Sequence, residues 1–382
     1  MSKCVYKFFL IYSFFLCIIW VWIYFNIIII IYLGNFFMFD KLAHDKIKRK
    51  NKVFALTAIG LAALFAGIRI LLTYNFIDPD NHFYIPGTDG FVLSADYIIA
   101  ACVIIIYILS VFLYKGRRNG VKCGEAADCF VQGSQSQVFS ASLALFLFMT
   151  AAVLQGYAFI NPGEALAELK GLSFIDKIAA YIKNYPFDSA IFFASVLSGV
   201  YFFKTAAMSF DMGDNLELLQ TNNNIKKQKH KYSSMHIILS FMPVAWAFLN
   251  VFKAFFDMSK SVNSPVRIYE LMSFLFIASY FVRESRMLLT QRCETAKFFT
   301  YAYIAVIISS ASALPNLIWS SFWIMRTNSG QIIYALEISL VVYILSRIYS
   351  QIRYGSFLLC EEEDLDNPAE ELKFTQTQTE EE

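Results

Sequence analysis

Eight apolar runs of about 20 residues follow one another along this 382-residue chain. A helix of about 20 apolar residues spans the ~30 Å hydrocarbon core of a bilayer. One such run could be a buried helix of a soluble protein, but eight in series favour a membrane protein. Lipid offers the backbone no hydrogen-bond partner, so each run is expected to be helical. The sequence therefore predicts an all-α, polytopic transmembrane helix bundle.

The boundaries of the spans follow from where the apolar runs begin and end. In chain order we expect them at Val53–Tyr74, Leu93–Tyr114, Val138–Ile160, Asp188–Met208, Met235–Phe256, Ile268–Met287, Phe298–Trp319 and Gln331–Gln351. Residues 38–352 would then form one membrane-embedded helical domain. Pro243 and Pro315 lie inside two of the spans and should kink them, because proline removes a backbone donor.

Residues 1–37 are a further apolar segment, in which 20 residues are Phe, Ile or Tyr. The run at residues 8–33 is too long for a signal-peptide core and has no small-residue cleavage site. One interpretation is a ninth span, with the N-terminus outside. We favour a second one, in which this segment is translated upstream DNA with AT-rich codons and the native protein begins at Met38.

The distribution of Lys and Arg predicts the orientation. With the eight spans above, 21 of these residues fall on one side and six in the loops of the other. Basic residues are concentrated on the cytoplasmic side of membrane proteins. We therefore expect a multi-pass protein of the plasma membrane, with both ends of the Met38 form in the cytoplasm. Residues 353–382, rich in Glu and Asp, should be a disordered cytoplasmic tail.

Two outer loops carry structural signals. Residues 75–91 hold two turn-forming clusters around an aromatic run, which predicts a short hairpin-like cap. Residues 161–187 have apolar residues at helical spacing with charged residues between them, which predicts an amphipathic helix at the outer interface. Such a helix could cover a pocket or simply cover loop backbone.

Ionisable residues inside the spans are the candidate site, because buried charges in a membrane are unfavourable. At 1.5 Å per residue they fall into two layers. The outer layer contains Arg69, Asp96, Glu270 and Glu337, and the inner layer contains Arg283 and Glu284, with Lys204 and Arg347 at the same level.

Arg69 and Glu337 are the pair that we expect to meet. They could form the ion-paired floor of an outward-facing pocket, or a clamp between two helices. Asp96 and Glu270 could instead be solvated. Lys204 and Arg347 lie close enough to the cytoplasm for their side chains to reach water.

No catalytic signature is present in the sequence. It lacks HExxH, GxSxG, a Walker loop and GxGxxG, and it has only four histidines. The acidic first loop does not match the calcium-loop pattern. We expect no cofactor and no metal, and the net charge of +2 suggests no nucleic-acid partner. An enzyme is the least favoured class.

Three short stretches carry a resemblance: YNFIDPDNHFY, YFVRESRMLLTQR and SALPNLI. At these stretches residues 38–352 resemble uncharacterised multispanning membrane proteins of Firmicutes. The resemblance implies a bacterial plasma-membrane protein and brings no activity, cofactor or catalytic residue. Residues 1–37 have no counterpart in it.

The sequence favours two functional classes over an enzyme. A small-molecule transporter or ligand-sensing protein is slightly favoured, because polar groups gather on the outer side, and it predicts a cavity reaching Arg69 and Glu337. The alternative is a structural or interaction subunit of a cell-envelope complex, with no such cavity. An intramembrane enzyme would need Glu270, Glu284 or Glu337 beside another carboxylate or a histidine.

Overall fold

The structure, a computed structural model, describes residues 45–78, 83–85, 89–113, 135–160, 174–221, 233–256, 264–290, 295–321 and 331–354. The chain divides into two compact units, Met1–Lys50 and Asn51–Glu382. Of the first unit the structure describes only residues 45–50, which are helical. The predicted extra span or start site in residues 1–37 and nearly all of the predicted acidic tail lie outside the described residues.

Ten helices make up almost all of the described chain. They are α2 (Asp45–Phe76), α3 (Asp89–Leu113), α5 (Gln135–Ile160), α6 (Phe174–Asn184), α7 (Pro186–Thr221), α8 (Ser234–Leu239), α9 (Met242–Phe256), α10 (Pro265–Thr290), α11 (Thr295–Ser321) and α12 (Gln331–Tyr354). Within the described residues, eight segments are long and apolar enough to cross a membrane, with α8 and α9 together forming one of them. The all-α polytopic bundle and its eight spans are therefore confirmed.

Prolines mark the beginning of two spans and the interruption of a third. α7 and α10 begin at Pro186 and Pro265, where a missing N–H is tolerated because the first turn has no partner for it. Pro243 is instead the second residue of α9, directly after the break that separates α9 from α8. Its ring would clash with the carbonyl of Leu239, the last residue of α8, which accounts for the break. α11 by contrast remains helical through Pro315.

The polar groups near the helix break are bonded across the bundle. The Ser285 hydroxyl on α10 donates to the backbone carbonyl of Ser240, at 2.8 Å. Similar contacts join other helices: hydroxyl oxygens lie 2.7 Å apart between Ser110 and Thr300 and between Ser140 and Ser346. Hydroxyl bonds of this kind hold membrane helices together where apolar burial provides little driving force.

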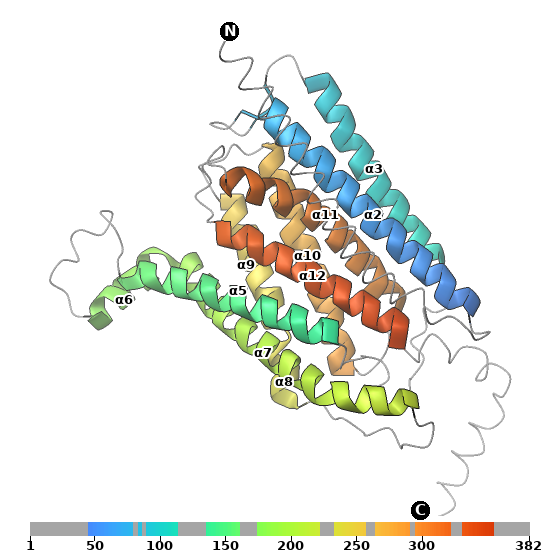
Figure 1. Ribbon diagram of the computed structural model, residues 1–382. Helices are drawn as coiled ribbons and strands as arrows, with labels where there is room; N and C mark the ends of the chain where they lie inside the picture. Colours follow the sequence, from blue (N-terminus) through green and yellow to red (C-terminus); the bar gives the residue numbers. More distant parts are fainter. Residues whose placement is uncertain are drawn as a thin grey trace, which may run out of the picture. The chain divides into compact units, whose positions relative to one another are not determined.

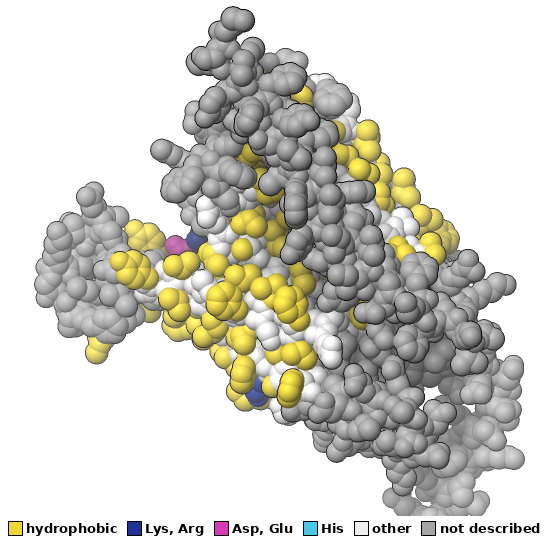
Figure 2. Space-filling model, viewed as in Figure 1, with side chains coloured by type: hydrophobic (Ala, Val, Ile, Leu, Met, Phe, Trp, Pro, Cys, Tyr) yellow, Lys and Arg dark blue, Asp and Glu magenta, His cyan; other side chains and the backbone are white. Residues whose placement is uncertain are grey.

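α11 is the central helix of the bundle and packs against α3, α10 and α12 (Figure 1). Within its membrane-length segment 83% of the residues are buried, against 22% in α3. α5 packs along α7 and α12, and α9 packs against α7 and α10. Apolar side chains are spread over much of the described surface in Figure 2, and charged ones are few, as expected where helices face lipid.

The two predicted outer features are both present among the described residues. Ile77 and Tyr84 form an antiparallel bridge after α2, which confirms a short hairpin. Two backbone bonds of 2.8 Å flank this bridge, from Asp78 to Phe83 and from Ile85 to Phe76. The amphipathic segment is a helix over its described part, α6, and residues 161–173 lie outside the described residues. The end of the bundle where α2 ends and α3 begins is called the hairpin end.

Candidate functional site

At the hairpin end, Arg69 is the centre of a polar cluster. Its Nη1 lies 3.3 Å from Asp96 Oδ1, and the Arg69 side chain is 3% exposed. Tyr269 of α10 donates to the same carboxylate oxygen at 3.0 Å. The Tyr269 ring also lies under the guanidinium, whose carbon is 4.0 Å from the ring centroid. This cluster therefore connects α2, α3 and α10.

The hairpin is attached to this cluster through Tyr84, whose hydroxyl donates to Asp96 Oδ2. Burial raises the pKa of the Tyr84 hydroxyl above its usual value, and the hydrogen bond to Asp96 raises it further. The hydroxyl therefore remains a protonated donor at neutral pH. We call Arg69, Asp96, Tyr84 and Tyr269 the hairpin cluster.

The predicted pairing of Arg69 with Glu337 is wrong, since the carboxylate beside Arg69 is Asp96. Glu337 on α12 is fully buried and accepts a hydrogen bond of 2.7 Å from the Ser273 hydroxyl on α10. Hydropathy places Arg69 and Glu337 at the same depth. Depth alone does not say which way a side chain points around its helix, and that direction decides its partner.

A small pocket with mostly apolar walls and a few polar groups also lies near the hairpin end, between α9, α10 and α12. Its volume is about 20 Å³, enough for about one water-sized group. Its lining residues are Asn250, Lys253, Ala254, Glu270, Phe274, Ile333 and Tyr334. Neither Arg69 nor Glu337 lines it, so this pocket is not the predicted cavity that reaches both of them.

Glu270 provides the negative charge of the pocket and is 3% exposed. Tyr334 donates to its Oε1 at 2.6 Å. The Asn250 amide donates to the backbone carbonyl of Trp246 at 2.8 Å. At the edge, Lys253 Nζ lies 2.7 Å from Asp188 of α7, and both of these side chains are about one-third exposed. The pocket therefore combines a buried carboxylate, an amide and a partly solvated ammonium group.

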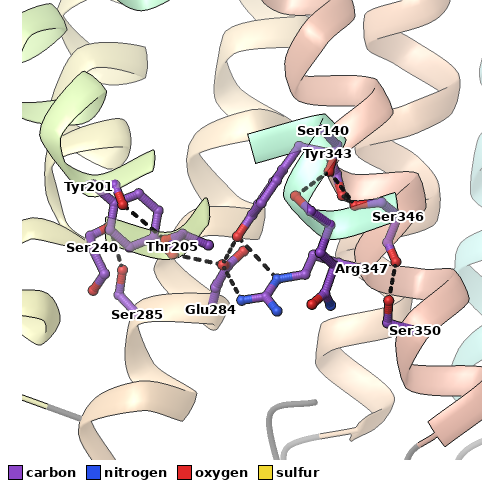
Figure 3. Close-up of polar contacts among 11 residues, drawn as sticks. Ser140, Tyr201, Thr205, Ser240, Glu284, Ser285, Tyr343, Ser346, Arg347 and Ser350 are labelled. Carbon is purple, nitrogen blue, oxygen red and sulfur yellow. Dashed lines mark hydrogen bonds and ion pairs between the residues drawn. The ribbon is translucent and has the colours of Figure 1, made fainter. Parts of the chain in front are cut away.

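A second buried cluster lies toward the opposite end of the bundle, around Glu284 of α10 (Figure 3). Its Oε1 accepts from Tyr201 of α7 at 2.8 Å and from Tyr343 of α12 at 2.6 Å. Arg347 Nη2 lies 3.3 Å from the same oxygen, and Arg347 Nε donates to the Tyr343 hydroxyl at 3.0 Å. All four side chains are fully buried. We call Glu284, Arg347, Tyr201 and Tyr343 the Glu284 cluster.

Sequence reasoning missed most of the Glu284 cluster. The predicted extension of Arg347 toward water is wrong, because its side chain is fully buried and ion-paired. One available signal is the spacing of Tyr343 and Arg347, which lie four residues apart and so share a helix face. Arg283, predicted for the same layer, is half-buried and stacks on Tyr301 at 5.2 Å.

The described residues were also searched for groups of side chains that could bind a metal ion. None of their histidine, cysteine and acidic side chains gather in a group of three or more that could hold a metal ion. The described residues that line the pocket include no histidine and no carboxylate besides Glu270. The hydrogen bonds and the ion pair of Glu284 join it to tyrosines and arginine.

Comparisons with known proteins found no matching family model, no matching curated protein and no matching solved structure. The contacts within the molecule are therefore the basis on which its function is inferred.

Proposed function

We propose that this integral membrane protein is a transporter or ligand-sensing protein for a small polar solute, which binds in the pocket at Glu270. The observation that carries the proposal is the combination of Glu270, Asn250 and Lys253 around one pocket within the bundle. Binding sites are concave and combine apolar walls with a few convergent polar groups. Ionisable residues inside membrane spans commonly mark the path or the site of a solute.

The chemistry of the pocket favours a solute that carries an amino group. Glu270 is the only carboxylate among the described residues of the lining, and Tyr334 bonds to one of its oxygens. An amino group placed there would donate a charge-assisted hydrogen bond to the carboxylate. The volume of about 20 Å³ admits such a group but not a whole amino acid. A larger solute therefore requires the pocket to widen, and the structure would represent its closed form.

The type of membrane and the orientation of the protein in it are part of the same proposal. The charge asymmetry of the loops supports placing the hairpin end outside and both ends of the Met38 form in the cytoplasm. A bacterial plasma membrane is part of this proposal. In that orientation the pocket receives its solute from outside the cell.

A structural or interaction subunit of an envelope complex is the second candidate. The observation that favours it is α3, whose membrane-length segment is the least buried of the eight. Large apolar side chains on α3, including Tyr97, Ile98 and Phe112, are exposed and could pack against another membrane protein. This candidate predicts that no small solute binds at the Glu270 pocket.

The test is a thermal-shift screen of the purified full chain in detergent against ammonium, methylamine, polyamines and the amino acids. We expect at least one amine to raise the unfolding temperature of the wild type and of Glu337→Gln, but not of Glu270→Gln. Glu337→Gln is the matched control, because Glu337 is also a buried carboxylate but does not line the pocket. No shift with any amine, or an equal shift in all three proteins, would overturn the proposal.

A further inference from the structure

Two residues of opposite charge line the Glu270 pocket, and they differ in how firmly the bundle holds them. Glu270 on α10 is 3% exposed and accepts a hydrogen bond of 2.6 Å from Tyr334. Lys253 on α9 also lines the pocket, but its side chain is 39% exposed. The carboxylate is therefore fixed in the interior, whereas the lysine extends from the pocket lining to the surface.

The ion-pair partner of Lys253 lies outside the pocket lining. Lys253 Nζ is 2.7 Å from Asp188 Oδ1, near the beginning of α7, and the Asp188 side chain is 34% exposed. Asp188 is not among the described residues that line the pocket. An ion pair between partly exposed side chains is weak, because water competes for both charges. The Lys253 ammonium can therefore exchange Asp188 for another carboxylate at little cost in free energy.

The position of Lys253 on its helix allows this exchange to take place at the pocket. Lysine carries its ammonium on a flexible four-carbon stem, so the charged end can turn while the backbone stays in place. Lys253 lies three residues after Asn250, which puts both side chains on one face of α9, and both line the pocket. One pocket thus receives a cation from α9 and a carboxylate from α10.

This combination of charges is complementary to a solute that carries both an amino group and a carboxylate. The amino group would donate to Glu270, and the carboxylate of the same solute would accept from Lys253. An amine without a carboxylate would make only the first of these contacts. It would also bring a second positive charge near the lysine, and like charges at short range repel each other.

We propose that the solute of the Glu270 pocket is a small zwitterion of the amino acid type, and that Lys253 determines this specificity by exchanging Asp188 for the solute carboxylate. The inference rests on the proposed function, because it requires the solute amino group at Glu270. No covalent bond forms or breaks. Lys253 is paired with a carboxylate before and after binding. Because its pair with Asp188 joins α9 to α7, the exchange also releases one edge of the pocket, which must widen to admit the solute.

The test compares amino acids with the amines that lack their carboxylate: glycine with methylamine, β-alanine with ethylamine, and 4-aminobutyrate with propylamine. Thermal-shift titrations of the purified full chain in detergent, at neutral pH and constant ionic strength, give a dissociation constant for each probe. In the wild type we expect at least one amino acid to bind about tenfold more tightly than its amine, which corresponds to one charge-assisted hydrogen bond.

Three variants assign this preference to Lys253. Lys253→Met removes the ammonium from a partly exposed position and should abolish the preference. Lys183→Met is the matched control and should keep it, because Lys183 is an exposed lysine at the end of α6 and does not line the pocket. Asp188→Asn releases Lys253 from its ion pair and should increase the preference for the amino acid.

The outcomes separate this inference from the proposed function. Equal binding of each amino acid and its amine by the wild type would overturn the inference and leave the amine site in place. A preference that survives in Lys253→Met, or that falls in Asp188→Asn, would also overturn it. If none of the six probes binds, the proposed function and the inference fail together. If Lys253→Met does not fold, the direction of the change in Asp188→Asn decides.

Discussion

Arg69 of α2 and Asp96 of α3 form an ion pair of 3.3 Å inside the bundle. Tyr84 from the hairpin and Tyr269 from α10 donate to the same carboxylate. The pair therefore connects the first two spans, the hairpin between them and a span that lies about 170 residues further along the chain. The ion pair and these hydrogen bonds explain why the charged residue Arg69 can be buried inside the bundle, with only 2% of its surface exposed.

Replacing Asp96 should be strongly destabilising, because it leaves Arg69 buried without a counter-charge. We expect Asp96→Ala to lower the free energy of unfolding by about 3–5 kcal/mol. The measurement is denaturant unfolding in mixed micelles. Asp188→Ala is the matched control, since its partner Lys253 is partly exposed, and a loss of at most about 1 kcal/mol is expected there. Equal losses in the two variants would contradict the central position of the hairpin cluster.

Three tyrosines in and beside the Glu284 cluster allow one substitution to be compared in three settings. Tyr201→Phe and Tyr343→Phe each remove a hydrogen bond to a buried carboxylate, which should cost about 1.5–3 kcal/mol. Tyr280→Phe removes a hydroxyl that has no hydrogen-bond partner among the described residues, so its effect should stay within about 0.5 kcal/mol. Unfolding of the three variants in the same micelles at neutral pH measures this. A large loss in Tyr280→Phe would show that its hydroxyl is bonded.

The helix break before Pro243 depends on a contact from α10. Ser285→Ala removes the hydroxyl that donates to the Ser240 carbonyl and should cost about 1 kcal/mol. Ser279→Ala, on the same helix, removes only a hydroxyl that bonds to the Leu275 carbonyl of its own helix. Its effect should be below about 0.5 kcal/mol. Thermal unfolding of both variants tests the difference, and equal effects would mean that the cross-helix bond does not stabilise the break.

The predicted orientation can be tested with two exposed positions in a background without native cysteines. Asn184 lies at the end of α6, and Ser233 directly precedes α8. The basic loop before Ser233 should keep it in the cytoplasm. A membrane-impermeant maleimide should therefore label Asn184→Cys on intact cells, but Ser233→Cys only after permeabilisation. The reverse pattern would invert the whole topology.

Sequence reasoning predicted the features that depend on position along the chain. Apolar run length gave the eight spans, and the turn clusters around residues 77–84 gave the hairpin. Of the two prolines predicted to kink a span, Pro243 follows a break between two helices, whereas α11 continues through Pro315. Each of these follows from local chemistry, so no knowledge of neighbouring helices was needed.

The partners of the buried charges could not be predicted in the same way. Arg69 and Glu337 have the correct depth for a pair, yet Arg69 faces α3 and α10, where Asp96 and Tyr269 lie. Arg347 is near enough to a helix end to reach water, but its side chain turns into the bundle toward Glu284. Both outcomes depend on rotation about the helix axis and on which helices are neighbours, and a hydropathy pattern contains neither.

The proposed function depends on the Glu270 pocket, and filling that pocket tests it most directly. Ala254→Phe places a ring in the pocket without changing any charge, whereas Ala100→Phe adds the same ring to an exposed position on α3. The measurement is the amine-induced rise in unfolding temperature of the two variants and the wild type. We predict that Ala254→Phe loses this rise and that Ala100→Phe keeps it. An unchanged rise in Ala254→Phe would contradict binding at this pocket.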